Sequence, residues 1–121
     1  MARVLVVEDE PTVREVLAVH LTTLGHAADM AENGARALDV ARRTRPDVVL
    51  IDIIMPGMNG IETLRRLRDL LPDAGFVMIS GADDQDLAMR ALELGAFDYI
   101  RKPFDLDYLD RILRVRLATS P

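Results

Sequence analysis

The chain has 121 residues, carries a formal net charge of −5 and contains no cysteine. Its length suits one compact domain, and half of its residues are hydrophobic, which is typical of a globular protein rather than a disordered or fibrous one. The negative charge argues against direct binding of nucleic acid, and the lack of cysteine excludes disulfides and thiolate metal sites.

Short apolar runs and longer helical patterns alternate five times along the chain. The first run, residues 4–7, is too short for a signal peptide and no later stretch suits a membrane span, so we expect a cytoplasmic protein without membrane association. The strands are placed at residues 4–7, 26–31, 47–52, 76–80 and 97–100. This alternation predicts the doubly wound α/β class, with a five-stranded parallel sheet covered by helices on both faces.

Five helices are expected between and after these strands. Their expected starts are Pro11, Asn33, Asn59 or Gly60, Asp83 or Asp84, and Asp105, and the first four are expected to stop at Gly25, Pro46, Pro72 and Gly95. The apolar stripes expected to face the core are Val13, Val16, Leu17, Leu21 and Leu24; Ala37, Leu38 and Ala41; Ile61, Leu64, Leu67 and Leu71; Leu87, Ala88, Ala91 and Leu92; and Leu106, Leu109, Ile112, Leu113 and Leu117. We expect residues 1–117 to form the ordered core of a single domain and residues 118–121 a frayed tail.

Polar side chains stand at the ends of the strands, where ligands bind in open α/β sheets. Glu8 and Asp9 follow the first strand, Asp52 ends the third, Ser80 ends the fourth, and Lys102 follows the fifth. If the strands take the flavodoxin-like order 2-1-3-4-5, the three carboxylates share a small volume. Two unit charges about 4 Å apart interact by roughly 4 kcal/mol at an effective dielectric of 20, so these acids need a cation or raised pKa values.

A hard divalent cation would balance these carboxylates, and a set of oxygen ligands suits Mg²⁺ or Mn²⁺. Asp52, once neutralised by the metal, can act as a nucleophile toward phosphorus and needs no general base, because a carboxylate has no proton to lose. Lys102 can offset the charge of the incoming phosphoryl oxygens, and the Ser80 hydroxyl can donate a hydrogen bond to another of them.

Four segments of the chain, in this order, resemble the receiver domains of response regulators of two-component signalling, the CheY-like superfamily. They are the acidic pair Glu8 and Asp9 and the residues 52–60, 80–82 and 95–104, and the resemblance extends over essentially the whole chain. Two positions depart mildly from the common pattern. Glu8 stands where many relatives carry aspartate, and Ser80 where many carry threonine, but both keep the oxygen that the site needs.

The resemblance implies a role for each residue of the acidic site. Asp52 would be the phosphoacceptor and Asp9 a direct metal ligand. Glu8 would act on the metal mainly through water, and the backbone carbonyl of Ile54 would be a further ligand. The chain is then a switch that phosphorylates and dephosphorylates itself with Mg²⁺ or Mn²⁺, and it is not an enzyme in any wider sense.

The resemblance also implies a switch and its partners. Ser80 and Tyr99 would form the switch pair, and Lys102, followed by a cis peptide to Pro103, would sense the phosphoryl group. We hypothesise that Tyr99 turns inward and changes the surface of the fourth helix, fifth strand and fifth helix. The expected phosphodonor is a sensor histidine kinase or phosphotransfer protein. The target would be an output domain or downstream protein, with a homodimer possible, and the chain is expected to be a stand-alone receiver or an excised N-terminal domain.

Three other functions fit parts of the pattern. A haloacid-dehalogenase-like phosphohydrolase also uses an aspartyl nucleophile, but that family carries an Asp-x-Asp motif. Here Ile54 stands where the second aspartate of the motif would be. A flavin-binding module would meet repulsion from the acidic residues 8–10. A degenerate receiver that only binds partners is disfavoured by the intact set of acids, hydroxyl and lysine.

Taken singly, the same residues have ordinary interpretations. Asp52 could cap a loop, Lys102 could be an exposed lysine, and Tyr99 could be a half-buried core residue. His20 is expected to be a hydrogen-bonded or edge residue of the core rather than a phosphate carrier, and His26 is expected to be structural. The functional interpretation therefore depends on whether the strand ends meet.

Overall fold

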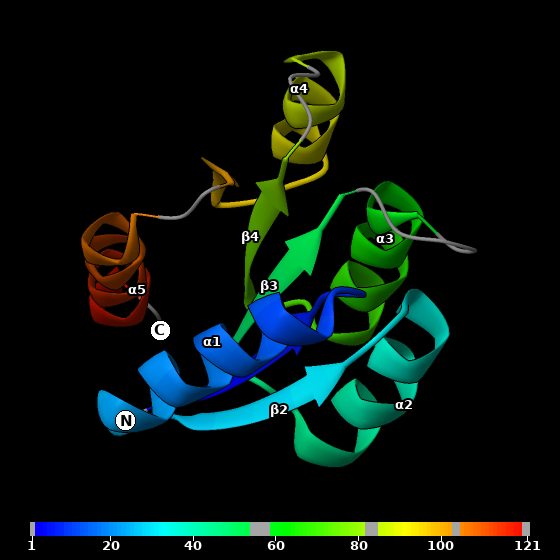
Figure 1. The fold of residues 1–121 in the computed structure, drawn as a ribbon. Helices are drawn as coiled ribbons and strands as arrows, with labels where there is room; N and C mark the ends of the chain where they lie inside the picture. The colour runs from blue at the N-terminus through cyan, green and yellow to red at the C-terminus, as the bar shows by residue number, and fades with distance from the viewer. Residues whose placement is uncertain (1, 54–58, 82–84, 103–104, 120–121) are drawn as a thin grey trace.

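A five-stranded parallel sheet forms the centre of the protein, with its strands in the order β2-β1-β3-β4-β5 (Figure 1). The structure is a computed structural model that describes residues 2–53, 59–81, 85–102 and 105–119. The strands are β1 (Arg3–Val7), β2 (Ala27–Ala31), β3 (Val48–Asp52), β4 (Gly75–Ser80) and β5 (Asp98–Arg101). The helices are α1 (Pro11–Thr23), α2 (Gly34–Thr44), α3 (Gly60–Leu70), α4 (Gln85–Glu93) and α5 (Leu106–Thr119). The predicted α/β class, strand order and five helices are confirmed, and every strand boundary lies within one residue of its prediction.

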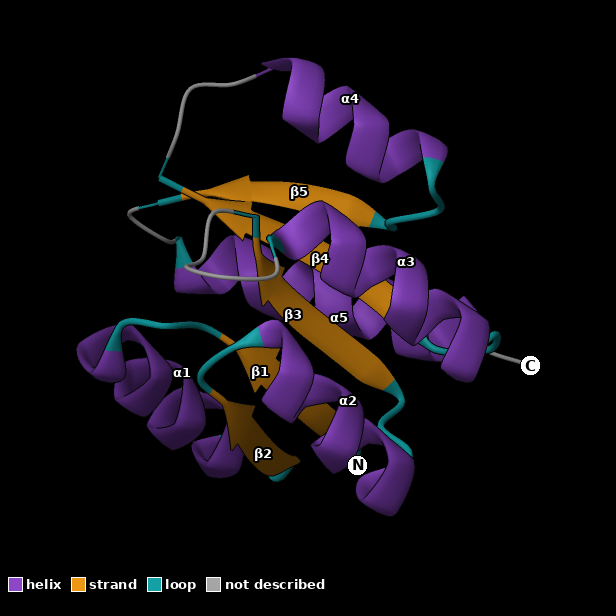
Figure 2. Ribbon diagram, turned by 90° about the vertical axis from the view of Figure 1, so that its right-hand side faces the viewer, coloured by secondary structure: helices purple, strands orange, loops and turns teal. Residues whose placement is uncertain are grey.

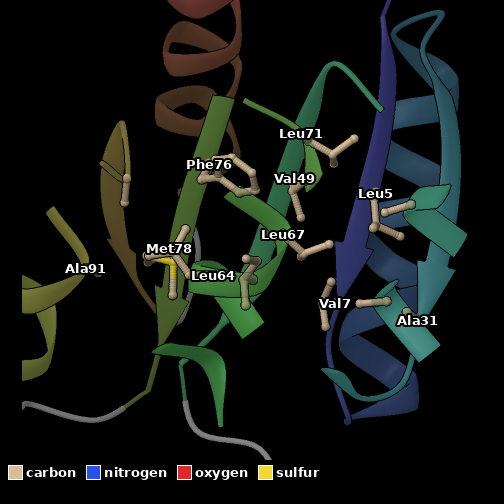
Figure 3. Packing of buried hydrophobic residues seen from close by; sticks show 14 of the residues in the cluster. Leu5, Val7, Ala31, Val49, Leu64, Leu67, Leu71, Phe76, Met78 and Ala91 are labelled. Atoms are coloured by element: carbon tan, nitrogen blue, oxygen red, sulfur yellow. The ribbon is translucent and has the colours of Figure 1, made fainter. Parts of the chain in front are cut away.

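Helices cover both faces of the sheet, as the apolar strands predicted (Figure 2). Successive residues of each strand point to opposite faces, so each strand supplies two separate cores. In β1, Leu5 and Val7 join the core against α2, α3 and α4, whereas Val4 and Val6 join the core against α1 and α5. Figure 3 shows the first of these cores, in which Leu64 of α3 lies near Met78 of β4 and Leu67 points toward β1.

Several helix boundaries follow the capping residues that the sequence indicated. The Asn33 side chain accepts a hydrogen bond from the Arg36 amide at 2.8 Å, and Asn59 accepts one from the Glu62 amide at 2.9 Å. Asp105 likewise accepts from the amide of Asp107 at 3.0 Å at the start of α5. α5 continues to Thr119, two residues beyond the expected end of the ordered core. None of the described helices combines the length and apolar character that a membrane crossing requires.

The buried stripes of α1 and α4 are narrower than predicted. In α1, Leu17 and Leu21 are fully buried, but Val16 is 47% exposed and Leu24 is 43% exposed. Val16 lies about 100° around the helix from Leu17, which places it on the flank of the stripe, and Leu24 follows the last helical residue. Leu92 of α4 is also exposed. The expected stripes were therefore wrong at these three positions.

Gly60 begins α3 where the helix passes very close to the end of β3. Its amide donates a hydrogen bond to the Ile53 carbonyl at 2.7 Å. A β-carbon at this position would lie 2.8 Å from that carbonyl oxygen and closer still to the carbonyl oxygen of Asp52. Only glycine therefore allows α3 to start directly beside the strand that carries Asp52.

The substitution Gly60→Ala is expected to lower the free energy of unfolding by about 1–3 kcal/mol, because the new methyl group meets backbone that cannot move aside. Urea denaturation followed by circular dichroism measures this change. Gly81→Ala is a matched control, since among the described residues its β-carbon would meet only the Lys102 side chain at 3.8 Å, an ordinary van der Waals distance. Equal stability of the two variants would contradict the prediction.

Candidate functional site

Three carboxylates meet at the carboxyl edge of the sheet. β1 and β3 are neighbours, with Val7 paired to Ile51, so Glu8 after β1 lies beside Asp52 at the end of β3. One carboxylate oxygen from each of Glu8, Asp9 and Asp52 lies within 4.8 Å of the others. Glu8 and Asp52 are buried and Asp9 is half-buried. The structure thus brings together the three acids that the sequence placed at this edge.

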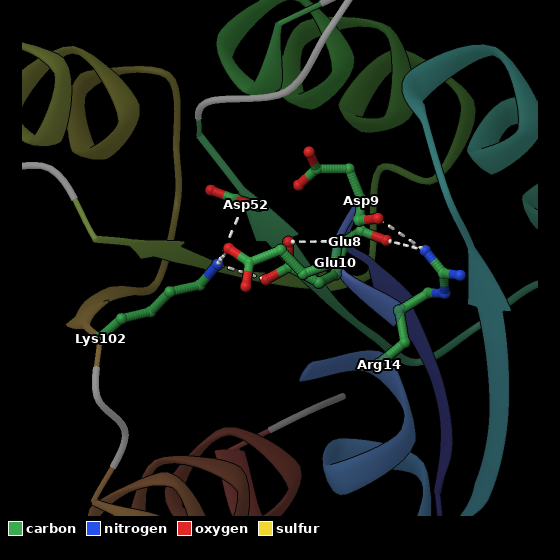
Figure 4. A network of polar contacts seen from close by, with 6 residues as sticks. All are labelled: Glu8, Asp9, Glu10, Arg14, Asp52 and Lys102. Atoms are coloured by element: carbon green, nitrogen blue, oxygen red, sulfur yellow. Dashed lines mark hydrogen bonds and ion pairs between the residues drawn. The ribbon is translucent and has the colours of Figure 1, made fainter. Parts of the chain in front are cut away.

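Lys102 enters the same site from the end of β5. Its backbone amide donates to the Ser80 carbonyl at 2.8 Å, which continues the pairing of β4 with β5. Its ammonium nitrogen lies 2.5 Å from Glu8 Oε1 and 3.2 Å from Asp52 Oδ2 (Figure 4). It also lies 3.4 Å from the exposed carboxylate of Glu10. One ammonium group therefore stands among three carboxylates.

Burial and charge shift the ionisation of this cluster. Burial raises the pKa of Glu8 to about 7, and the neighbouring Asp52 contributes to this rise while Lys102 opposes it. Burial of Lys102 disfavours its charged form, but the adjacent Glu8 and the charge of Asp52 outweigh this and hold its pKa above the usual value. Lys102 therefore stays protonated, whereas Glu8 is poised to bind or release a proton near neutral pH.

The other expected residues lie near this edge or outside the described part of the chain. Ser80 is buried at the end of β4, one residue beyond Ile79, which pairs with Asp52. Tyr99 is half-buried in β5 and packs against the core on the α4 side of the sheet. The expected ligand Ile54 lies outside the described residues.

Pro103, expected to follow a cis peptide, also lies outside them.

Two residues near the acids were not identified from the sequence. Glu10 contacts Lys102, as described above, and its amide donates to Glu8 Oε2 at 3.3 Å. Arg14 donates to the backbone carbonyls of Glu8 at 2.8 Å and Asp9 at 3.1 Å. The only signal in the sequence was the place of Arg14 in the first turns of a helix that begins at Pro11, within side-chain reach of the preceding loop.

The donor set fits a hard divalent cation. All three clustered groups offer carboxylate oxygen, the ligand type that Mg²⁺ and Mn²⁺ prefer. Glu8 Oε1 is buried and has no hydrogen-bond partner among the described residues, although the Lys102 ammonium lies close to it. Three acids against one ammonium leave negative charge that a dication would offset. Glu8, Asp9 and Asp52 are therefore the residues that would hold such an ion.

The two histidines have structural partners. His20 Nε2 lies 2.7 Å from Asp110 Oδ1 of α5, and both side chains are partly buried. His26 Nδ1 accepts a hydrogen bond from the Ala2 amide at 3.1 Å. Both observations agree with the expectation of a hydrogen-bonded edge residue and a structural residue.

Comparison with known proteins identifies relatives along nearly the whole chain. The family model described as response regulator receiver domain matches residues 4–114. Response regulator MprA of Mycobacterium sp. (strain KMS) is 38% identical over 120 residues, covering 98% of this chain and 52% of MprA. Regulatory protein AtoC of Escherichia coli (strain K12) is 39% identical over 112 residues, covering 93% of this chain and 24% of AtoC.

A solved structure agrees with these matches. The crystal structure of a response regulator receiver domain protein from Clostridium thermocellum superposes with a TM-score of 0.92 at 28% identity, covering 98% of this chain and 95% of that one. The chain spans about half the length of MprA and about a quarter of AtoC.

The raised pKa of Glu8 predicts how stability depends on pH. In the unfolded chain the Glu8 carboxyl loses its proton near its ordinary pKa of 4.5, but in the folded chain it keeps the proton up to about pH 7. The folded state binds more protons between these values, so the contribution of Glu8 to stability is full below pH 4.5 and is lost as pH rises through 7. Ionised Glu8 therefore destabilises the metal-free fold at about pH 8.

We expect Glu8→Gln to raise the free energy of unfolding by about 1–3 kcal/mol at about pH 8 and to change it little at about pH 5, because glutamine cannot ionise. Urea denaturation with a chelator present at both pH values measures this. Glu15→Gln, at an exposed position of α1, should keep the pH dependence of the wild type. A Glu8→Gln variant that is less stable than wild type at the higher pH would contradict the assigned shift.

Proposed function

The chain belongs to the response regulator receiver domain family, and on this basis we propose that it is a switch in which Asp52 accepts a phosphoryl group. Receiver domains of response regulators serve two-component signalling and are switches rather than typical enzymes. The position of Asp52 is the observation that carries the proposal. Its carboxylate is buried at the end of β3, within 4.8 Å of oxygens of Glu8 and Asp9 and 3.2 Å from the Lys102 ammonium.

The reaction joins a carboxylate oxygen of Asp52 to phosphorus and breaks the bond from phosphorus to a nitrogen of the donor, a phosphohistidine. Asp52 attacks as an ion, so no residue has to remove a proton from it. Lys102 offsets the charge of the phosphoryl oxygens, and the Ser80 hydroxyl donates a hydrogen bond to one of them. The raised pKa of Lys102 keeps its charge present throughout the physiological range.

Glu8, Asp9 and Asp52 would hold Mg²⁺ or Mn²⁺, with the carbonyl of Ile54 as the further expected ligand. When bound, the cation supplies positive charge that offsets the carboxylates and lets a phosphoryl group approach. Glu8 and Asp9 keep their places through the backbone, because the Glu8 amide donates to the Ala31 carbonyl at 3.0 Å and Arg14 holds both carbonyls. The backbone that carries these two acids is therefore held in place without the ion.

The phosphodonor is a sensor histidine kinase or phosphotransfer protein, and the signal passes to an output domain or downstream protein. The α4, β5 and α5 surface suits this contact, because that part of the chain carries five of the eight exposed large apolar side chains among the described residues: Met89, Leu92, Phe97, Tyr108 and Val115. The same surface is available for a homodimer. We propose one receiver unit over residues 1–121, acting in the cytoplasm without direct contact to nucleic acid.

Phosphorylation would act on this surface through Ser80, Lys102 and Tyr99. The added charge on Asp52 draws the hydroxyl and the ammonium toward the phosphoryl oxygens. Tyr99 is half-buried and pairs with Met78 across the β4–β5 ladder, so an inward turn of its ring would alter the packing below α4. A shift from mostly off to mostly on requires about 5.5 kcal/mol of differential stabilisation, part of which a partner supplies.

Incubation with Mg²⁺ and a small-molecule acyl phosphate is expected to add one phosphoryl group to the wild-type chain, seen by intact mass spectrometry. Asp52→Asn should gain none, because an amide is a poor nucleophile, and a chelator should abolish the reaction. Asp69→Asn, an exposed aspartate of α3, should behave as wild type. An unmodified wild-type chain would contradict the proposal and favour a receiver that only binds partners.

Phosphorylation is also expected to change amide hydrogen exchange in α4 and β5. α4 is lightly anchored, since Ala91 is buried while Met89 and Leu92 are exposed, so a small shift in packing alters its local opening. Exchange mass spectrometry of the chain with and without the phosphoryl group measures this. α2, at the β2 edge of the sheet, should keep its protection. Unchanged exchange in α4 of the phosphorylated chain would contradict the switch but not the phosphorylation.

A further inference from the structure

Arg14 reaches from α1 to the loop that carries the acidic pair. One of its guanidinium nitrogens, Nη1, donates to the Glu8 carbonyl at 2.8 Å and to the Asp9 carbonyl at 3.1 Å. In Figure 4 Arg14 approaches the loop from the side opposite to Lys102. Two cations therefore border the acidic cluster, and they act differently. Lys102 contacts carboxylates, whereas these two bonds of Arg14 go to the backbone.

The loop needs this support because α1 begins without a side-chain cap. Among the described residues, the side chain of the capping residue Glu10 makes no hydrogen bond to the first turn of α1. α2 and α3, by contrast, are capped by Asn33 and Asn59. A cap normally fixes the path of the chain into a helix. Here the two hydrogen bonds from Arg14 fix it instead.

These bonds determine the direction of the Asp9 side chain. The carbonyls of Glu8 and Asp9 belong to the two planar peptide units on either side of the Asp9 α-carbon. Holding both planes fixes the backbone dihedral angles of Asp9 and with them the direction in which its carboxylate leaves the chain. Asp52 is fixed by β3 and Glu8 by its hydrogen bond to Ala31 of β2. Asp9 is the one of the three acids whose direction depends on the loop.

The same contact is linked to the Glu8 side chain through one peptide unit. The peptide unit between Asp9 and Glu10 accepts from Arg14 through its carbonyl and donates to Glu8 Oε2 through its amide at 3.3 Å. Hydrogen bonds in such a series polarise one another, so the guanidinium charge strengthens the donor that faces the Glu8 carboxylate. Arg14 thus binds the backbone beside Glu8 without competing with a cation for carboxylate oxygens.

We propose that Arg14 is a positioning residue of the metal site, holding Asp9 beside Glu8 and Asp52 in the arrangement that binds a divalent cation. Arg14 itself contacts neither the cation nor the phosphoryl group. The inference rests on the proposed function and extends it to a residue outside the set of ligands. Residues that orient metal ligands commonly change metal affinity by about 10–100-fold when replaced.

The test measures Mg²⁺ binding to the intact chain by isothermal titration calorimetry, for wild type, Arg14→Ala, Arg14→Met and Arg14→Lys. We expect Arg14→Ala and Arg14→Met to raise the dissociation constant by about tenfold and Arg14→Lys by less, because lysine restores a charged donor. Arg14→Met keeps the apolar stem, so it preserves the packing of α1. Arg42→Ala, which removes an exposed arginine of α2 paired only weakly with Asp39, should bind Mg²⁺ as wild type does.

A second readout separates positioning from a purely structural role. The rate of phosphorylation by an acyl phosphate should fall by the same factor as the affinity when Mg²⁺ is below saturation, and should return to within about twofold of wild type at saturating Mg²⁺. A folded Arg14→Ala or Arg14→Met chain whose dissociation constant lies within about twofold of wild type would overturn the inference. A wild-type chain that takes no phosphoryl group would instead overturn the proposed function, so the two failures are distinguishable.

Discussion

Electrostatic repulsion among three carboxylates at one end of a parallel sheet is the constraint on which the rest of this site depends. The sheet forces Glu8, Asp9 and Asp52 together because β1 and β3 are neighbours. The fold can tolerate them only with nearby positive charge, with protons, or with a bound cation. The structure shows the first two remedies, in the contacts of Lys102 and in the raised pKa of Glu8, and its oxygen donors suit the third.

Lys102 and Arg14 stabilise the acidic cluster in different ways. Lys102 is part of the β4–β5 pairing, since its amide bonds to the Ser80 carbonyl, and its ammonium is bound directly to acid oxygens. The same residue therefore contacts both the acids and the end of β4. Arg14 belongs to α1 and acts on the loop backbone instead. Lys102 thus connects Asp52 to the β4–β5 edge, whereas Arg14 connects the loop of the acidic pair to α1.

Much of the fold and the identity of the acidic cluster could be predicted from the sequence. Runs of branched apolar residues marked the strands, and Asn33, Asn59 and Asp105 marked helix starts, because these signals are local. The exposure of Val16 could not be predicted, since it depends on which neighbouring element covers each flank of α1. Arg14 was missed for a related reason: its partners are backbone carbonyls, and these leave no mark in the sequence.

The alternation of side chains along the strands determines which face of the sheet each site residue occupies. Counting by twos leads from Val6 to Glu8, from Leu50 to Asp52 and from Ile100 to Lys102, and the three apolar residues all face the core beside α1 and α5. Glu8, Asp52 and Lys102, which contact one another through the lysine, therefore follow residues that all lie on the same face of the sheet. Loss or gain of one residue inside any of these strands would turn its last side chain to the opposite face. Insertions and deletions that preserve this site are therefore confined to the loops between elements. Within the strands, only substitutions preserve it.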